Sequence, residues 1–174
     1  MNRIALVLAS TLLVVATASP AATVGEPAPA FQLNDQYGEQ HDLADFAGKW
    51  LVVFFYPRAD TPGCTTEACN FRDNIYAIRA AGAEVVGISV DSVDEQKKFS
   101  DKYKLPFTLL SDAGGQTCDA YGVLRNFGST EIANRESFLI DPDGVVAKHY
   151  TRVNPETHTQ QVIADLQELA AAES

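Results

Sequence analysis

Hydrophobic and polar residues follow one another in blocks that predict alternating strands and helices. Residues 51–56 form an apolar, aromatic run typical of a buried strand, and the run stops at Pro57, which cannot continue a central strand. Residues 64–81 then place apolar side chains at helical spacing, and a second apolar strand is expected at residues 84–90. Two buried strands joined by a helix predict a βαβ unit with parallel strands.

The rest of the chain continues this alternation. Ser92 and Glu95 are spaced as a capping box, which predicts a helix from there to about residue 103. The sequence Asp-Pro-Asp-Gly at residues 141–144 predicts a hairpin between the last two strands, whereas residues 125–135 look polar and irregular. The order of the predicted strands and helices indicates an α/β fold with a central mixed sheet flanked by helices. Its remaining predicted elements are strands at 31–33, 41–43, 107–110, 137–140 and 145–150, a helical turn at 44–49, and helices at 116–121 and 155–172.

The first 22 residues have the pattern of a secretory signal. Arg3 gives a short positive start, residues 4–16 are apolar and uncharged, and small residues follow up to cleavage positions at Ala18 or Ala21. The alternative is a retained membrane anchor, but the apolar run falls short of the roughly 20 residues that span a bilayer. We expect cleavage, export to the periplasm and no stable membrane insertion, with residues 23–174 forming one domain.

Composition narrows the class of protein. The 174 residues are 46% hydrophobic and 21% charged, as in a globular domain. The net charge of −10 argues against nucleic-acid binding, which requires a basic surface. The chain contains three cysteines, so at least one is left over if disulfides form.

Cys64 stands where a predicted strand passes into the first turn of a helix. The first N–H groups of a helix lack intrahelical partners, and the helix dipole adds about half a positive charge there. Both effects favour the thiolate, which is the nucleophilic form of cysteine. Glu67, one turn further on, opposes this effect if its carboxylate faces the sulfur.

Cys69 follows five residues later. On a regular helix this spacing separates the two Cα atoms by about 8.7 Å, whereas a disulfide requires no more than roughly 7 Å. A Cys64–Cys69 bond would therefore unwind the first helical turns, which suits a catalytic cycle; a permanent structural bridge is the alternative. Cys118 is most simply a half-buried free thiol, although pairing with Cys64 in an oxidised form stays open.

The spacing Pro57-x-x-x-Thr61-x-x-Cys64 resembles the active-site motif of the peroxiredoxins. With a second cysteine at position 69, the chain is similar to the peroxiredoxin Q or bacterioferritin comigratory protein subgroup, from about residue 24 to about residue 170. The resemblance implies a thioredoxin-like fold and a thiol peroxidase that reduces hydrogen peroxide and organic hydroperoxides. It also implies that no metal, haem or flavin cofactor is needed.

The resemblance also implies roles for individual residues. Cys64 attacks the peroxide and becomes a sulfenic acid, Cys69 converts it into an intramolecular disulfide, and a thioredoxin-like dithiol protein reduces that bond. Thr61 holds the peroxide and Pro57 shields it from water. Arg135, in a segment that resembles the family's Arg-x-Ser/Thr-Phe segment, points at the sulfur; without the resemblance it would be a surface arginine. Because one chain contains both cysteines, we expect a monomer.

Two other functions remain open. A thioredoxin-like disulfide oxidoreductase acting on protein thiols would favour a Cys-X-X-Cys motif, which the spacing of Cys64 and Cys69 does not match. A non-catalytic thioredoxin-fold module would consume no peroxide. Residues 124–134 depart from the aromatic and lysine-rich loop of the family, and this loop borders the pocket, so the sequence leaves the preferred peroxide open.

Overall fold

The computed structural model describes residues 21–172. Of the expected export signal, only Ala21 and Ala22 lie within them; the rest falls outside the described residues. Ala22 is 8% exposed and packs into the core cluster on one face of the sheet. No helix between residues 21 and 172 is long and apolar enough to cross a membrane.

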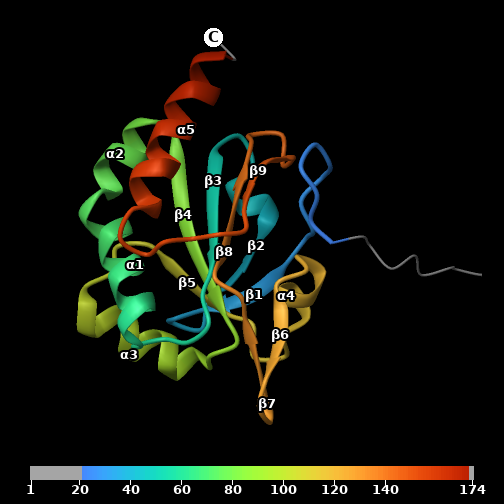
Figure 1. The fold of residues 1–174 in the computed structure, drawn as a ribbon, viewed down its shortest axis with the longest axis vertical. Coiled ribbons are helices and arrows are strands. Elements are labelled where there is room, and N and C mark those ends of the chain that lie inside the picture. The colour runs from blue at the N-terminus through green and yellow to red at the C-terminus, as the bar shows by residue number, and fades with distance from the viewer. Residues whose placement is uncertain (1–20, 173–174) are drawn as a thin grey trace, which may run out of the picture.

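A seven-stranded mixed sheet forms the centre of the fold (Figure 1). Its order is β2-β1-β5-β4-β3-β8-β9. The pairs β3–β4 and β4–β5 are parallel and all other pairs are antiparallel, which confirms the predicted βαβ unit and the mixed sheet. The strands are β1 (Gln32–Asp35), β2 (Gln40–Asp42), β3 (Trp50–Phe55), β4 (Ala83–Ser89), β5 (Thr108–Ser111), β8 (Glu136–Ile140) and β9 (Val146–Tyr150).

Helices cover both faces of this sheet. Four of them pack on one face, where Figure 1 shows them together on the left: α1 (Pro62–Asp73), α2 (Ile75–Ala80), α3 (Val93–Tyr103) and α5 (His158–Ala172). The other face carries the 3₁₀ turn η1 (Leu43–Phe46), α4 (Gln116–Ala120) and the N-terminal segment. Every residue of β3 is buried, because β3 is covered on both faces, and this explains its continuous apolar sequence.

The side chains of β3 divide the interior into two layers. Val52 and Phe54 point into the layer that also contains Cys64, whereas Val53 and Phe55 point into the opposite layer. Burying one such side chain contributes about 1.5–3 kcal/mol. The sheet thus fixes the carboxyl end of β3, from which the next loop starts.

Two predicted helices differ from the observed ones. The helix expected over residues 64–81 is interrupted at Asn74, whose backbone has φ −110° and ψ 8° and whose Nδ2 donates to the carbonyl of Asn70 at 2.9 Å. An asparagine side chain that bonds the backbone in this way competes with the regular helix. The last helix begins at His158 rather than residue 155. By contrast, the capping box of Ser92 and Glu95 is confirmed.

The prediction of an irregular segment at residues 125–135 was wrong. This region contains a two-stranded hairpin of β6 (Leu124–Phe127) and β7 (Thr130–Ala133) outside the main sheet. Its turn consists of Gly128, with φ 63°, and Ser129. A Gly-Ser dipeptide between two four-residue runs is a hairpin signal, which the polar composition of the segment concealed.

Candidate active site

The carboxyl end of β3, the start of α1 and the start of β8 meet at Cys64. Cys64 lies in the first turn of α1 and is 1% exposed. Arg135 directly precedes β8, whose first residue pairs with Phe55 at the end of β3. Arg135 Nη2 donates to Cys64 Sγ at 3.2 Å. The structure therefore places the predicted arginine against the predicted reactive sulfur, across 71 positions of sequence.

A buried carboxylate holds this arginine. Arg135 Nη1 donates to Glu67 Oε2, and the side chain of Glu67 is fully buried in α1. Gly63 allows the close approach, because a Cβ atom there would lie 3.1 Å from Arg135 Nη2. Glu67 thus acts on Cys64 through Arg135, which contacts both. The sequence had indicated that Glu67 opposes the thiolate if its carboxylate faces the sulfur, whereas in the structure this carboxylate accepts a hydrogen bond from Arg135.

Burial dominates the electrostatics of Glu67. It raises the pKa of this carboxyl to about 7, while the charge and hydrogen bond of Arg135 act in the opposite direction. The second carboxyl oxygen, Glu67 Oε1, has no hydrogen-bond partner in the described structure. The site therefore contains a titratable group whose proton is held more tightly in the folded than in the unfolded chain.

This difference predicts a pH dependence of stability. Because folding raises the pKa of Glu67 from 4.5 to about 7, the stabilisation is full below pH 4.5 and is lost as pH rises through 7. Relative to Glu67→Gln, the wild type should lose free energy of unfolding between pH 5 and pH 7.5, at most about 3 kcal/mol at 1.36 kcal/mol per unit. Urea unfolding of both proteins at the two pH values measures this.

The control for this prediction is Glu84→Gln, because Glu84 forms a surface ion pair with Arg79. Its pH dependence should follow that of the wild type. Equal slopes for the wild type and Glu67→Gln would contradict the effect assigned to Glu67.

The loop between β3 and α1 is anchored to α3 and to the end of β4. The carboxylate of Asp60 accepts hydrogen bonds from Lys102 Nζ at 2.8 Å and from the hydroxyl of Tyr103 at 2.7 Å. Asp91 Oδ2 accepts the backbone N–H of Ala59 at 2.7 Å. These contacts fix the loop before the first turn of α1. No local pattern in the sequence indicates these contacts, because each joins residues that are distant in the chain.

Thr61 occupies the N-cap position of α1 but makes no side-chain capping bond. Its hydroxyl instead donates to the carbonyl of Arg58 at 2.9 Å. A hydroxyl that donates once keeps its oxygen lone pairs as acceptors, and the first N–H groups of α1 keep their capacity to donate. Pro57 and Thr61 together line a groove beside the helix start. Donors and acceptors for a small polar ligand thus lie close to Cys64.

The other two cysteines lie in different environments. Cys69 is half-buried on α1, one and a half turns after Cys64, and both thiols are free. Cys118 is fully buried, which corrects the half-buried expectation, and burial raises the pKa of its thiol. It lies in the layer on the opposite face of the sheet from Cys64. Pairing of Cys118 with Cys64 would therefore require disruption of the core.

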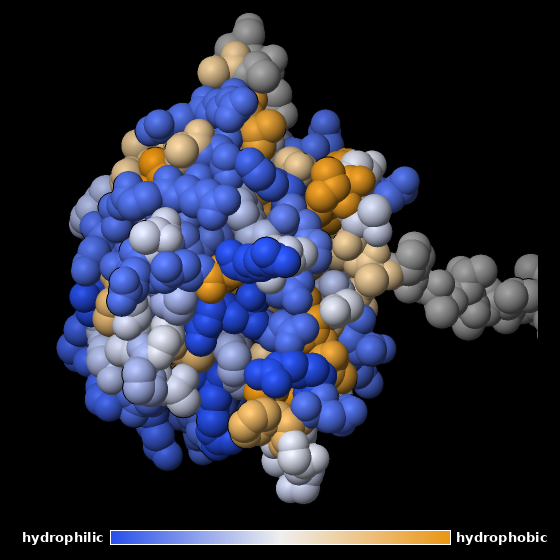
Figure 2. All heavy atoms as spheres, viewed as in Figure 1, coloured by the Kyte–Doolittle hydropathy of each residue, from blue (hydrophilic) through white to orange (hydrophobic). Residues whose placement is uncertain are grey.

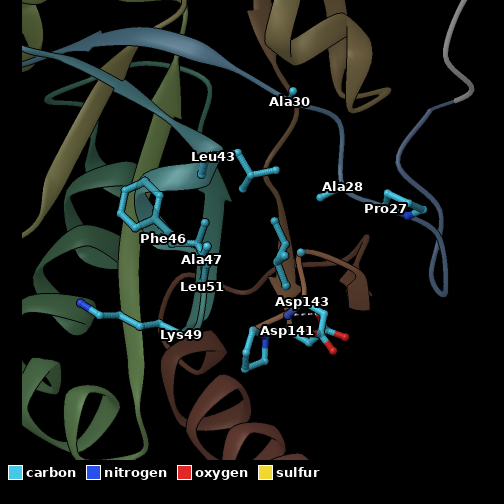
Figure 3. A pocket seen from close by; sticks show the side chains of 14 residues that line it. Pro27, Ala28, Ala30, Leu43, Phe46, Ala47, Lys49, Leu51, Asp141 and Asp143 are labelled. Atoms are coloured by element: carbon cyan, nitrogen blue, oxygen red, sulfur yellow. Dashed lines mark hydrogen bonds between the residues drawn. The ribbon is translucent and has the colours of Figure 1, made fainter.

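Two further features lie away from this site. A pocket of about 360 Å³ opens at the other end of β3, between η1, the N-terminal segment and the β8–β9 turn (Figure 3). Asp141, labelled in Figure 3, holds the β8–β9 turn by accepting hydrogen bonds from the backbone N–H groups of Asp143 and Val145.

Within residues 21–172, the group of side chains that could hold a metal ion is Asp35, Glu39 and His41. It lies on the β1–β2 hairpin, three strands from β3, and does not involve the cysteines.

Comparison with known proteins adds the following similarities. The model of the AhpC/TSA family matches residues 24–149. Peroxiredoxin Q, chloroplastic, from Sedum lineare is 46% identical over 148 residues, 84% of this chain and 79% of that protein. The putative peroxiredoxin bcp of Coxiella burnetii is 44% identical over 147 residues, 82% of this chain and 97% of that protein.

Solved structures agree with these matches. Peroxidoxin BcpB from Mycobacterium tuberculosis has a TM-score of 0.80 at 34% identity, covering 85% of this chain and 98% of that one. Peroxiredoxin Q from Xanthomonas campestris has a TM-score of 0.79 at 34% identity, covering 86% and 98%. The fold is accordingly the thioredoxin-like α/β fold expected from the sequence.

Proposed function

This chain belongs to the AhpC/TSA family, and we propose that it is a thiol peroxidase whose reacting group is the sulfur of Cys64. The observation that carries the assignment to Cys64 is the contact between its buried sulfur and Arg135 Nη2 at 3.2 Å. A fixed guanidinium stabilises a thiolate and offers further donors to a peroxide oxygen. The protein-thiol oxidoreductase alternative lacks support, because α1 contains no Cys-X-X-Cys motif.

The first step is attack of the Cys64 thiolate on the terminal oxygen of the peroxide. An S–O bond forms, the O–O bond breaks, and the departing oxygen takes up a proton to leave as water or an alcohol. Arg135 and the first N–H groups of α1 stabilise the negative charge that develops on oxygen. The hydroxyl of Thr61 accepts a hydrogen bond from the peroxide, and Pro57 limits the access of water.

The second step requires Cys69. When the first turns of α1 unwind, the thiol of Cys69 condenses with the sulfenic acid, forming a disulfide and releasing water. A thioredoxin-like dithiol protein then reduces the disulfide by exchange through a mixed disulfide. Sulfur carries the electrons throughout, so no metal, haem or flavin enters the cycle. One chain supplies both cysteines, which supports a monomer.

Trapping the intermediate tests this function. In Cys69→Ser, one equivalent of hydrogen peroxide should leave a sulfenic acid on Cys64 that dimedone labels, whereas the wild type should form a Cys64–Cys69 disulfide that peptide mapping detects. If Cys64 stayed unmodified in Cys69→Ser, the assignment of Cys64 as the group that reacts with peroxide would be wrong. The pair would then have to be a structural bridge on a non-catalytic module.

The second half of α1 is anchored to α5 and to the segment that precedes it. Asn70 Nδ2 donates to the carbonyl of Pro155 at 2.8 Å, and Gln160 Nε2 donates to Asn74 Oδ1 at 3.1 Å. Phe71 is fully buried. The first half contacts Arg135 through two side chains, those of Cys64 and Glu67. We infer that this anchor opposes the unwinding that brings Cys69 to Cys64, because Asn70 is the next residue of the helix and is held by the carbonyl of Pro155.

Loosening this anchor should speed the formation of the disulfide. Asn70→Ala removes a hydrogen bond worth about 1 kcal/mol, which corresponds to about a fivefold larger unwound fraction. Since a faster second step leaves less time for further oxidation, less Cys64 should reach the sulfinic acid at high peroxide. Mass spectrometry of the oxidised protein measures this fraction. Asn34→Ala, at an exposed position of β1, is the control; an unchanged sulfinic fraction in Asn70→Ala would contradict the anchor.

We also propose export, with cleavage of the leader before Ala22. The packing of Ala22 into the domain supports a cleavage position that leaves this residue in the mature chain. In the periplasm the reductant would be an exported or membrane-linked thioredoxin-like protein. N-terminal sequencing of protein recovered from a periplasmic fraction tests the proposal; a mature chain that still begins at Met1 would overturn it.

A further inference from the structure

One side chain of α3 connects the carboxyl ends of three neighbouring strands. The strands β3, β4 and β5 are adjacent and parallel, so their carboxyl ends meet at the same edge of the sheet. Gln96 Oε1 accepts a hydrogen bond from the hydroxyl of Tyr56, the residue after β3. Gln96 Nε2 donates to Ser89 Oγ, at the end of β4, at 2.9 Å, and to the carbonyl of Leu110, in β5, at 3.0 Å. The amide of Gln96 therefore fixes the three strand ends relative to one another.

These hydrogen bonds continue into the loop that precedes α1. Ser89 Oγ donates to Asp91 Oδ2 at 2.7 Å, and the same oxygen accepts the backbone N–H of Ala59 at 2.7 Å. Tyr56 directly precedes Pro57 in the chain, and Ala59 follows two residues after it. The network thus begins and ends in the same loop and holds it on both sides of Pro57.

The side chains of this network are buried. Tyr56, Ser89 and Gln96 are fully buried, and Asp91 is 5% exposed. Among the buried side-chain oxygen and nitrogen atoms of these four described residues, none lacks a hydrogen-bond partner. Figure 2 shows mostly hydrophilic residues over the lower left of the molecule, where Figure 1 places α3, so this helix meets solvent with its outer face and turns Gln96 inward. A fully paired buried network is rigid, whereas the loss of one partner leaves a polar group that is costly to bury.

The network adjoins the reactive sulfur. Tyr56 packs in the same layer of the interior as Cys64. Burial raises the pKa of the Tyr56 hydroxyl, and the negative charges of Asp91 and Cys64 raise it further. The hydroxyl therefore keeps its proton at neutral pH and stays the donor to Gln96. A shift of this tyrosine would move the strand end from which the loop beside Cys64 starts.

The loop depends on such support, because its conformation is strained. Asp60 has φ 58°, in the left-handed region, which a residue other than glycine adopts only where its surroundings hold it. Asp60 lies between Ala59, whose N–H is bound by Asp91, and Thr61, the N-cap residue of α1. The path from the network to the start of α1 is therefore three residues long.

We propose that Gln96 is a positioning residue for the peroxide reaction, because it holds the loop of Pro57 and Thr61 in the place beside Cys64 that peroxide binding requires. Gln96 acts through Tyr56 on one side of the loop and through Ser89 and Asp91 on the other. The proposal rests on the proposed peroxidase function and deepens it, because it assigns the support of the peroxide site to α3, outside the segment that contains the reactive cysteine.

Gln96→Met tests the proposal, because methionine has a similar length and is apolar, so it makes none of the three hydrogen bonds. The kcat/KM for hydrogen peroxide should fall about 10–100-fold, as expected when the groups around a reacting atom are displaced. Alkylation of Cys64 by iodoacetamide, which needs the thiolate but no oriented peroxide, should change by less than about threefold. Mass spectrometry of the Cys64 peptide measures it. Gln96→His should recover part of the lost activity, since one imidazole nitrogen can accept from Tyr56 while the other donates to Ser89.

A second variant carries the same test if Gln96→Met fails to fold. Tyr56→Phe removes only the hydroxyl that donates to Gln96 and keeps the ring in the core. Its kcat/KM should also fall while alkylation of Cys64 is retained. The two substitutions together should cost less than the sum of their separate effects, because both break the same hydrogen bond. Lys97→Met, on the exposed side of α3, is the control and should react as the wild type does.

The results separate positioning from a general effect on the fold or on the thiolate. If peroxide reaction and alkylation fell in parallel in these variants, the positioning role of Gln96 would be wrong. A wild-type kcat/KM in both Gln96→Met and Tyr56→Phe would overturn it as well, and the peroxidase function would stand. A wild type that consumes no peroxide of any kind would overturn the proposed function itself.

Discussion

Replacing Cys64 with serine is expected to reduce peroxide consumption by a factor on the order of 10³ or more. A serine hydroxyl is not ionised near neutral pH and cannot be oxidised to a sulfenic acid, so both the nucleophile and the electron donor are lost. The loss should be complete for every peroxide and every reductant. Hydrogen peroxide consumption by the reduced protein with a dithiol reductant measures it.

The other two cysteines provide matched controls for this experiment. Cys118→Ala should keep its activity, because Cys118 is buried on the opposite face of the sheet from Cys64. Cys69→Ser should still react once with peroxide and should turn over with a small thiol that reaches Cys64 directly. If Cys64→Ser consumed peroxide as fast as the wild type, the reaction would have to be assigned to a different group.

The elements that the sequence predicted well are those specified by local patterns. The continuous apolar run of β3, the capping box of Ser92 and Glu95, and the turn between β8 and β9 each depend on residues close together in the chain. The same holds for the start of α1, where Pro57, Thr61 and Cys64 lie within one short segment. The structure contains these features where the sequence predicts them, because residues close together in the chain specify them.

Most features that the sequence missed depend on contacts between distant segments, whereas the β6–β7 hairpin was missed although its turn signal is local. The break at Asn74 separates α1 from α2, and Asn70 and Asn74 both bond residues about 85 positions away. The burial of Cys118 follows from the position of α4 on the second face of the sheet. The pairing of Glu67 with Arg135 spans 68 positions, so no local pattern signals it.

Arg135 belongs to neither group, because it was predicted correctly but not from a local residue pattern. Its own neighbourhood is polar and resembles any strand entry, so residue patterns alone favour a surface arginine. Only the resemblance to a known family pointed to its position, and the structure places it against Cys64. Whether its contribution is chemical or merely structural is a question that substitution can answer.

Arg135→Gln is expected to lower kcat/KM for hydrogen peroxide by about 10²–10³, the usual cost of removing a charged donor from a developing oxyanion. The same change leaves the buried carboxyl of Glu67 without its cation. Removing one partner of a buried ion pair costs about 3–5 kcal/mol of stability, and the cost should be smaller at acidic pH, where Glu67 takes up a proton. Steady-state kinetics and urea unfolding measure the two losses separately.

The double variant Arg135→Gln, Glu67→Gln separates the two roles. Because it removes both members of the pair, it leaves no buried charge, and its stability should return towards that of the wild type. Its kcat/KM should stay as low as that of Arg135→Gln, since the guanidinium that contacts the sulfur is still missing. If activity recovered together with stability, Arg135 would act only as the counter-ion of Glu67. If stability recovered alone, Arg135 would act on the peroxide reaction itself, and Glu67 would act by positioning it.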